Sequence, residues 1–227
     1  MDISRTEADR IISEAGWLSH MIPELRATVL RHAILMRFVD EPVFRYGDPI
    51  GGIYGLVAGT SAMNLAPLDE TPRLIHLSGP GIWTGEECFI SRQSRRGELR
   101  ALGELWMMHL PLDAMDKIAS LNPEAIRAFA NISLSSKETL VRVIHDLQKP
   151  QADRRIAAVL QRTTSVGQRQ IPLSQADLGI MANASRQQVN AILQRFVAAG
   201  WIEHQYRAIT VKDAGALYNF AAGDGSD

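Results

Sequence analysis

The segment from Ala182 to Phe196, ANASRQQVNAILQRF, begins with hydrogen-bonding side chains and continues as an apolar helix. Arg186 carries a planar guanidinium fork, and Gln187, Gln188 and Asn190 carry amides that both donate and accept hydrogen bonds. These groups make paired hydrogen bonds to a planar edge that presents two polar atoms. Their concentration in the first two helical turns therefore indicates recognition of a ligand through hydrogen bonding.

Two short helices joined by a sharp turn are predicted around these side chains. Ser174 is the expected N-cap of the first helix, QADLGIMA, and Ser185 is the expected N-cap of the second. Asn183 tolerates a left-handed backbone, which the turn between the helices requires. The second helix is expected to bury its apolar side, formed by Val189, Ile192, Leu193 and Phe196.

A helix-turn-helix of this kind places the start of its second helix against base edges in the DNA major groove. Arginine forms two hydrogen bonds with guanine, and glutamine or asparagine forms two with adenine. The predicted base contacts are therefore Arg186, Gln187, Gln188 and Asn190. Phosphates are expected to be held by hydroxyls, amides and a second guanidinium, from Ser174, Gln175, Ser185 and Arg195.

The segment that follows, WIEHQYRAITV, predicts two short strands around a turn, Trp201–His204 and Ala208–Val211, which would form a wing. Between Gln151 and Lys212 there are eight basic side chains and three acidic ones, a net charge of +5, whereas residues 1–150 carry a net charge of −3. A basic segment attached to an acidic one indicates a polyanionic partner. An ordinary helical hairpin with a solvated polar face is the alternative, and the wing and the charge together favour double-stranded DNA.

The chain before this region changes from β-rich to helical. Short runs of strand-forming residues separated by Gly, Pro and Asp occupy residues 32–110 and predict a sandwich, roll or barrel, preceded by one or two short helices at residues 7–30. From Leu112 the period becomes helical, with Asp113 as a predicted cap and Asn122-Pro123-Glu124 as a helix start. Pro150 disfavours helix at its neighbours, so residues 149–151 are a predicted hinge or helix boundary.

Two adjacent apolar stripes run along the predicted helix that ends near Gln148. The first stripe contains Ile126, Phe129, Ser133, Leu140, Val143 and Leu147. The second contains Ala130, Leu134, Val141 and Ile144. A surface this wide can contact its own β region on one side and a second helix on the other. A helix packed only on its own sheet is the alternative.

Composition excludes several classes of protein. The 227 residues fit one large domain or two of ordinary size, and 46% hydrophobic with 22% charged residues is typical of a globular protein. No run approaches the ~18 uninterrupted apolar residues of a membrane span. The N-terminal stretch MDISRTEADR lacks the basic-then-apolar pattern of an export signal. We therefore expect a cytoplasmic protein with no membrane partner.

Metal, cofactor and catalytic sites have no support in the sequence. The six histidines are scattered without HxH or HExxH spacing, so no metal is expected. One cysteine, Cys88, excludes an internal disulfide and a cluster held by four cysteines of one chain. A buried structural thiol is favoured over a redox switch at this cysteine. The histidine and carboxylate spacing of a cupin-like enzyme is missing, so we expect no cofactor and no catalytic residues.

Several motifs resemble one family in the same order along the chain. LSQADL at 173–178, ASRQQV at 184–189 and AGWIE at 199–203 resemble the C-terminal domain of the cyclic-AMP receptor protein/FNR (Crp/FNR) family of bacterial transcription regulators. FRYGD at 44–48, IYGLVAG at 53–59, and the GPG and GE pairs at 79–81 and 85–86 resemble its N-terminal half. The likeness extends over about residues 17–217.

The resemblance implies an α+β fold with a double-stranded β-helix, the cyclic-nucleotide-binding-like β-roll, at residues 1–111 with N-terminal helices. A dimerisation helix at 112–149, a winged helix-turn-helix at 150–220 and a disordered tail at 221–227 would follow. It also implies a sequence-specific regulator that binds palindromic DNA as a homodimer, with RNA polymerase as a further partner. The expected dimer contacts are Phe129, Ser133, Leu140, Val143 and Leu147.

The cyclic-nucleotide binders of this family hold the phosphate with backbone amides and an arginine, while a glutamate holds the ribose hydroxyl. Gly85 and Glu86 match that cassette, and Arg95 falls at the arginine position. Arg96 replaces the Ser/Thr that follows, and Glu98 adds an unfavourable acid. A gap-free count places Leu140 and Val141 where cyclic-AMP binders have hydroxyls for adenine.

The candidate effector residues are therefore Gly85, Glu86, Arg95 and Arg96, which form half of a nucleotide pocket. The favoured interpretation is a structural ion pair between Glu86 and Arg95, with a different small-molecule effector or none. The alternative function is a cyclic-nucleotide-binding module that acts through protein partners.

Overall fold

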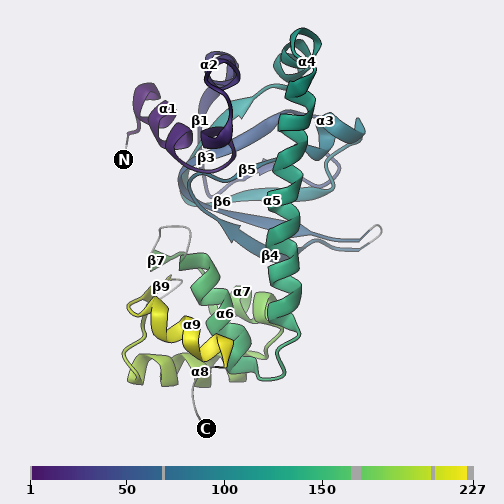
Figure 1. Cartoon of the computed structure of the whole chain (residues 1–227). Coiled ribbons are helices and arrows are strands. Elements are labelled where there is room, and N and C mark those ends of the chain that lie inside the picture. Colours follow the sequence, from purple (N-terminus) through teal and green to yellow (C-terminus); the bar gives the residue numbers. More distant parts are fainter. Residues whose placement is uncertain (1, 68–69, 165–169, 206–207, 224–227) are drawn as a thin grey trace. The chain divides into compact units, whose positions relative to one another are not determined.

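The computed structural model describes residues 2–67, 70–164, 170–205 and 208–223. The chain forms two compact units, one of Met1–Pro72 with Ser78–Thr139 and the other of Arg73–Leu77 with Leu140–Asp227 (Figure 1). The element order is mixed helix and sheet, as the α+β prediction requires.

The first unit begins with helices α1 (Arg5–Glu14) and α2 (Pro23–His32), separated by a 3₁₀ helix at Trp17–His20. The Ser4 hydroxyl accepts a hydrogen bond from the Glu7 amide at 3.2 Å and so caps α1. Pro23 occupies the first turn of α2, where its missing N–H costs no helical hydrogen bond. The predicted helices at residues 7–30 are confirmed.

The predicted β-rich region forms a six-stranded sheet. Its strand order is β1-β6-β3-β4, while β2 pairs with β6 and β5 with β3. The pairs β1–β6, β2–β6, β3–β5 and β3–β6 are antiparallel. The bounds are β1 Ile34–Val39, β2 Pro42–Phe44, β3 Ile53–Leu65, β4 Arg73–Ser78, β5 Trp83–Thr84 and β6 Gly97–Leu110.

The two faces of this sheet bury different cores. Met107 lies in a cluster with Phe38, Phe44, Leu56 and Leu99, whereas Met108 lies in a larger cluster with residues of the N-terminal helices. Successive side chains of a strand point to opposite faces, which explains why neighbouring methionines join different clusters. Both sides of β6 are therefore apolar at this point.

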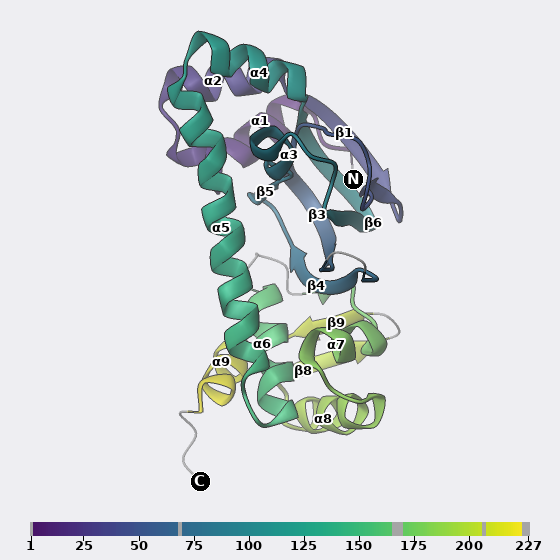
Figure 2. The same cartoon turned by 90° about the vertical axis from the view of Figure 1, so that its right-hand side faces the viewer.

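Helix α3 (Glu87–Ser91) lies between β5 and β6, and α4 (Leu112–Leu121) and α5 (Glu124–Leu147) follow β6 (Figure 2). The Asn122-Pro123-Glu124 start is confirmed. Asp113 is not the cap of α4, because the N-cap is Pro111 and no side chain caps this helix. Cys88 is fully buried, as expected of a structural thiol.

Helix α5 has a buried side and an exposed apolar side. Phe129 and Val143 are 0% and 5% exposed within their own chain, so the prediction that they form dimer contacts is wrong. Ser133 is half-buried with its hydroxyl bonded inside the unit, whereas Leu140 and Leu147 are exposed. The second apolar stripe is the open one: Leu134, Val141 and Ile144 are 57%, 56% and 57% exposed.

The second unit contains the predicted helix-turn-helix and wing. After the end of α5, its elements are α6 Ala152–Thr164, β7 Gln170–Ile171, α7 Gln175–Ala182, α8 Arg186–Ala198, β8 Ile202–Gln205, β9 Ala208–Val211 and α9 Ala214–Ala222. The strand order is β7-β9-β8. The helix boundary at Pro150 and both wing strands are confirmed.

Helix α9 was not expected from the sequence. Phe220 of α9 packs against Phe196 and Trp201, with ring centroids 5.7 and 5.4 Å away. The prediction of a disordered tail at 221–227 therefore begins too early, and residues 224–227 lie outside the described residues. In the described ranges no helix is long and apolar enough to cross a membrane, and no three His, Cys, Asp or Glu side chains are grouped to hold a metal ion.

Candidate DNA-binding surface

Local hydrogen bonds set the start of each helix in the helix-turn-helix. The Ser174 hydroxyl accepts from the Asp177 amide at 3.1 Å and caps α7. The Ser185 hydroxyl accepts from the Gln188 amide at 3.2 Å, and the Gln188 side-chain oxygen accepts from the Ser185 amide at 2.9 Å. This reciprocal capping box satisfies amides that the helix leaves free, so both predicted N-caps are confirmed.

The turn between α7 and α8 depends on two residues. Asn183 has φ 45° and ψ 55°, the left-handed conformation expected of it. A side chain on Gly179 would place Cβ 2.9 Å from the Ala184 carbonyl oxygen, so only glycine allows this close approach. The helices then share a buried apolar surface that includes the predicted Val189, Ile192, Leu193 and Phe196.

Replacing Asn183 by alanine is expected to lower the free energy of unfolding by about 1 kcal/mol, because alanine is strained in the left-handed region. Replacing Asn183 by glycine should cost little, because glycine adopts positive φ freely. Urea unfolding of both variants measures the difference. Equal stability of the alanine and glycine variants would show that backbone conformation at this position is unimportant.

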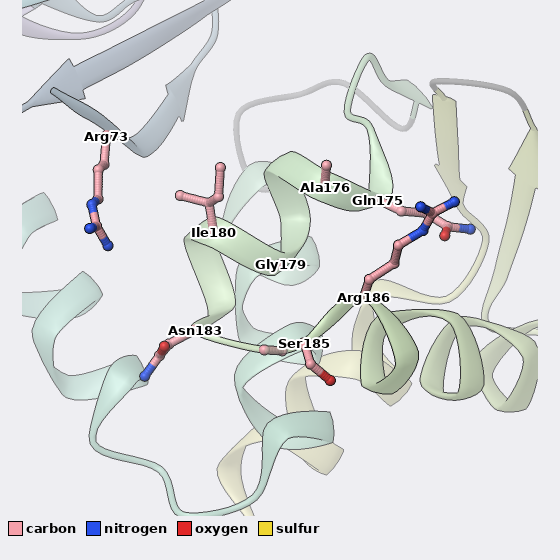
Figure 3. A pocket seen from close by; sticks show the side chains of 9 residues that line it. Arg73, Gln175, Ala176, Gly179, Ile180, Asn183, Ser185 and Arg186 are labelled. Atoms are coloured by element: carbon pink, nitrogen blue, oxygen red, sulfur yellow. The ribbon is translucent and has the colours of Figure 1, made fainter. Parts of the chain in front are cut away.

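The polar start of α8 is exposed to solvent. Arg186, Gln187 and Asn190 are all exposed, and Arg186 makes no side-chain hydrogen bond or ion pair with any residue that the structure describes. Figure 3 shows the Arg186 side chain at the beginning of α8, extending away from the helix axis. Gln194 is also exposed, and at i+4 from Asn190 it continues the same helical stripe. Sequence reasoning missed it, although the period identifies it.

The predicted phosphate-contacting side chains differ in how many of their polar atoms already have partners within the protein. Arg195 is 61% exposed at its side chain but pairs with Asp153 at 3.2 Å. Gln175 lies at the first turn of α7, with its amide nitrogen 3.5 Å from His204 Nε2 of the wing. The hydroxyls of Ser174 and Ser185 cap α7 and α8. The side-chain oxygen of Gln188, a predicted base contact, completes the capping box of α8. The amide nitrogen of Gln188 is the part that its capping role leaves for a ligand.

In the other unit, Arg95 is fixed inside the protein. It is 3% exposed, and its two terminal nitrogens donate to the carbonyl oxygens of Gly85 and Gly52 at 2.8 and 2.6 Å. The guanidinium carbon lies 4.3 Å from the centre of the Phe44 ring. A Cβ at Gly51 or Gly85 would come within 2.7 or 2.6 Å of this guanidinium, so the glycines form a slot for it.

Glu86 lies near this slot but is paired elsewhere. It is 3% exposed, and Oε1 accepts a hydrogen bond from the Ser133 hydroxyl of α5 at 2.9 Å. The predicted ion pair between Glu86 and Arg95 is therefore wrong, because backbone carbonyls hold the arginine and a serine holds the glutamate. Arg96 is exposed and donates to Gln93, outside the slot.

Burial raises the pKa of Glu86 above its ordinary value, and the neighbouring Glu87 adds to this effect. The native state thus holds this proton more tightly than the unfolded chain. The contribution of Glu86 to the free energy of unfolding is therefore fully present below the ordinary glutamate pKa, and it is lost as the pH rises through the raised pKa.

Glu86→Gln is expected to raise the melting temperature at pH 8, with an advantage that shrinks toward pH 5. Calorimetric melts across this range measure it, with exposed Glu138→Gln as the matched control. A Glu86→Gln advantage that does not change with pH would contradict the raised pKa.

The fold and the surface define a β-roll joined by a long helix to a winged helix-turn-helix, which is the architecture of a Crp/FNR-type protein. Residues 154–220 match the family model of the Crp-like helix-turn-helix domain. The chain therefore carries a Crp-like helix-turn-helix domain, and over most of its length it is similar to transcription regulators of the Crp/FNR type. Regulators of this type bind DNA and dimerise.

Known relatives agree with this class. The chain is 22% identical over 221 residues to the CRP-like cAMP-activated global transcriptional regulator of Mycobacterium tuberculosis, covering 92% of this chain and 97% of that one. It is 22% identical over 186 residues to the anaerobic regulatory protein of Haemophilus influenzae, covering 78% and 72%. The structure of FixK2 from Bradyrhizobium japonicum has a similar fold, with a TM-score of 0.68, 18% identity, and 83% and 96% coverage.

Proposed function

We propose that this chain is a sequence-specific regulator that binds palindromic double-stranded DNA as a homodimer. The observation that carries the proposal is the start of α8, where a guanidinium and several amides face solvent while the apolar side of the helix is buried. Base edges in the major groove offer the paired donors and acceptors that these groups bind. A DNA partner and a transcription-regulator class support a cytoplasmic location and RNA polymerase as a second partner.

The exposed stripe on α5 supports self-association. Leu134, Val141 and Ile144 recur at spacings of seven and three, and Leu140 and Leu147 flank them. A stripe with this period pairs with an identical helix in a two-fold arrangement. Two copies joined along α5 would present two α8 helices to two half-sites.

Selection of bound sequences from a random DNA pool tests the proposal. The expected result is a palindrome whose binding constant falls steeply with salt, because phosphate contacts release counterions. Equal affinity for all sequences at ordinary salt, or no binding, would contradict it.

We further propose that cyclic AMP and cyclic GMP are not the effectors of this chain through the Arg95 cassette. To bind a phosphate, Arg95 would have to break two carbonyl hydrogen bonds and leave its ring contact with Phe44. The adenine positions expected from the sequence are the apolar Leu140 and Val141. Calorimetry with both nucleotides tests this, and micromolar binding lost on Arg95→Ala would overturn it in favour of a cyclic-nucleotide module.

A further inference from the structure

A single arginine connects the end of the α5–α6 junction to the turn of the helix-turn-helix. Arg155 lies in the first turns of α6, and its Nη1 donates to the carbonyl oxygens of Lys149 and Pro150 at 2.8 and 2.9 Å. Its Nε donates to the Ala182 carbonyl at 2.7 Å, and its Nη2 donates to the Asn183 carbonyl at 2.9 Å. Four carbonyls from two separate segments are therefore held by one side chain.

The four carbonyls that Arg155 binds lie at the ends of two helices. Ala182 is the last residue of α7 and Asn183 makes the left-handed turn, so these carbonyls belong to a helix end that lacks onward helical partners. Lys149 and Pro150 follow α5 in the same way. A guanidinium has five N–H donors in a fixed plane, whereas a lysine ammonium has one nitrogen. Only arginine can fix both segments in one geometry.

A second contact links α5 directly to α6. Asp146, in the last turn of α5, forms a buried ion pair with Arg162, in the last turn of α6. Lys149 Nζ lies 3.6 Å from the same carboxylate. Side-chain contacts from Asp146 and Arg155 therefore hold the predicted hinge segment, residues 149–151, at both of its ends. Of these two residues, Arg155 also contacts the turn before α8.

We propose that Arg155 is a positioning residue for DNA recognition, which sets the orientation of α8 relative to the C-terminal end of α5. The inference depends on the proposed homodimer, because α5 would then join the two copies. Asn183 precedes the first residue of α8 by only three positions, so holding its carbonyl holds the entry of the recognition helix. In a dimer this orientation determines the distance between the two half-sites that are read.

Half-site spacing provides the test. Binding is measured for the palindrome selected by the wild-type protein and for two versions with one base pair inserted or removed at the centre. Arg155→Lys keeps the positive charge but lacks the fork, so the preference for the selected spacing should fall by about tenfold. Arg154→Lys, at the neighbouring position, is the matched control and should keep the wild-type preference.

A purely structural role would weaken binding to all three spacings alike, so an unchanged ratio between spacings would overturn the proposal. Thermal melts show whether Arg155→Lys folds. If it does not, Arg155→Gln, whose amide can still reach one segment, is measured in the same way and must show the lost preference. If the proposed function itself is wrong, the result is distinguishable from a wrong role for Arg155, because the wild-type protein would then select no palindrome.

Discussion

Arg186→Ala is expected to weaken binding to the selected site by about 1–3 kcal/mol per half-site, which is about 5- to 150-fold. The same variant should lose its preference at one base pair in each half-site. The reason is that the Arg186 guanidinium is exposed and unpaired among the described residues, so it is free to form two hydrogen bonds to one guanine. Titration of site variants at one salt concentration measures both effects.

Arg195→Ala is the matched control on the same helix. Arg195 lies about two and a half turns after Arg186 and already pairs with Asp153, so its expected contact is with phosphate. This variant should weaken all DNA sequences alike and reduce the salt slope by about one. Identical behaviour of the two variants would show that the base and phosphate roles are assigned incorrectly.

Ile144→Glu is expected to convert the protein to a monomer and to weaken binding to the full palindrome by more than about 100-fold. The side chain is 57% exposed in the single chain and is the C-terminal member of the apolar stripe of α5. A carboxylate there would be buried without a partner in the dimer, and the second half-site would lose its advantage of high effective concentration. Sedimentation velocity and DNA titration measure the two results.

Asn131→Glu adds the same charge to an exposed position on another side of α5 and should leave a dimer with normal affinity. A variant Ile144→Glu that remains dimeric would place the subunit interface elsewhere.

Sequence reasoning succeeded where the determinants are local. The capping box at Ser185 and the left-handed Asn183 involve residues no more than three positions apart, so residue type alone predicts them. The wing was also predictable, because its two strand-forming runs are close in the sequence and pair directly, from Ile202 with Val211 to Gln205 with Ala208.

Contacts between distant segments were not predictable in the same way. Helical period identified two apolar stripes on α5 but could not show that Phe129 and Val143 are buried within the chain while Leu134 and Ile144 are open. The partners of Glu86 and Arg95 were also misjudged, because opposite charges suggest a pair and backbone carbonyls carry no sequence signal. Arg155 was missed for the same reason, since two of its acceptors lie 27 and 28 residues away.

Entry of the α8 start into the major groove is tested most directly by methylation interference on the selected palindrome. Methyl groups at guanine N7 lie in the major groove, whereas those at adenine N3 lie in the minor groove. The expected result is that N7 methylation in each half-site blocks the wild-type protein, and that Arg186→Ala becomes insensitive at one of those guanines. Interference from minor-groove methylation alone, or the same guanines blocking both proteins, would contradict recognition by this helix.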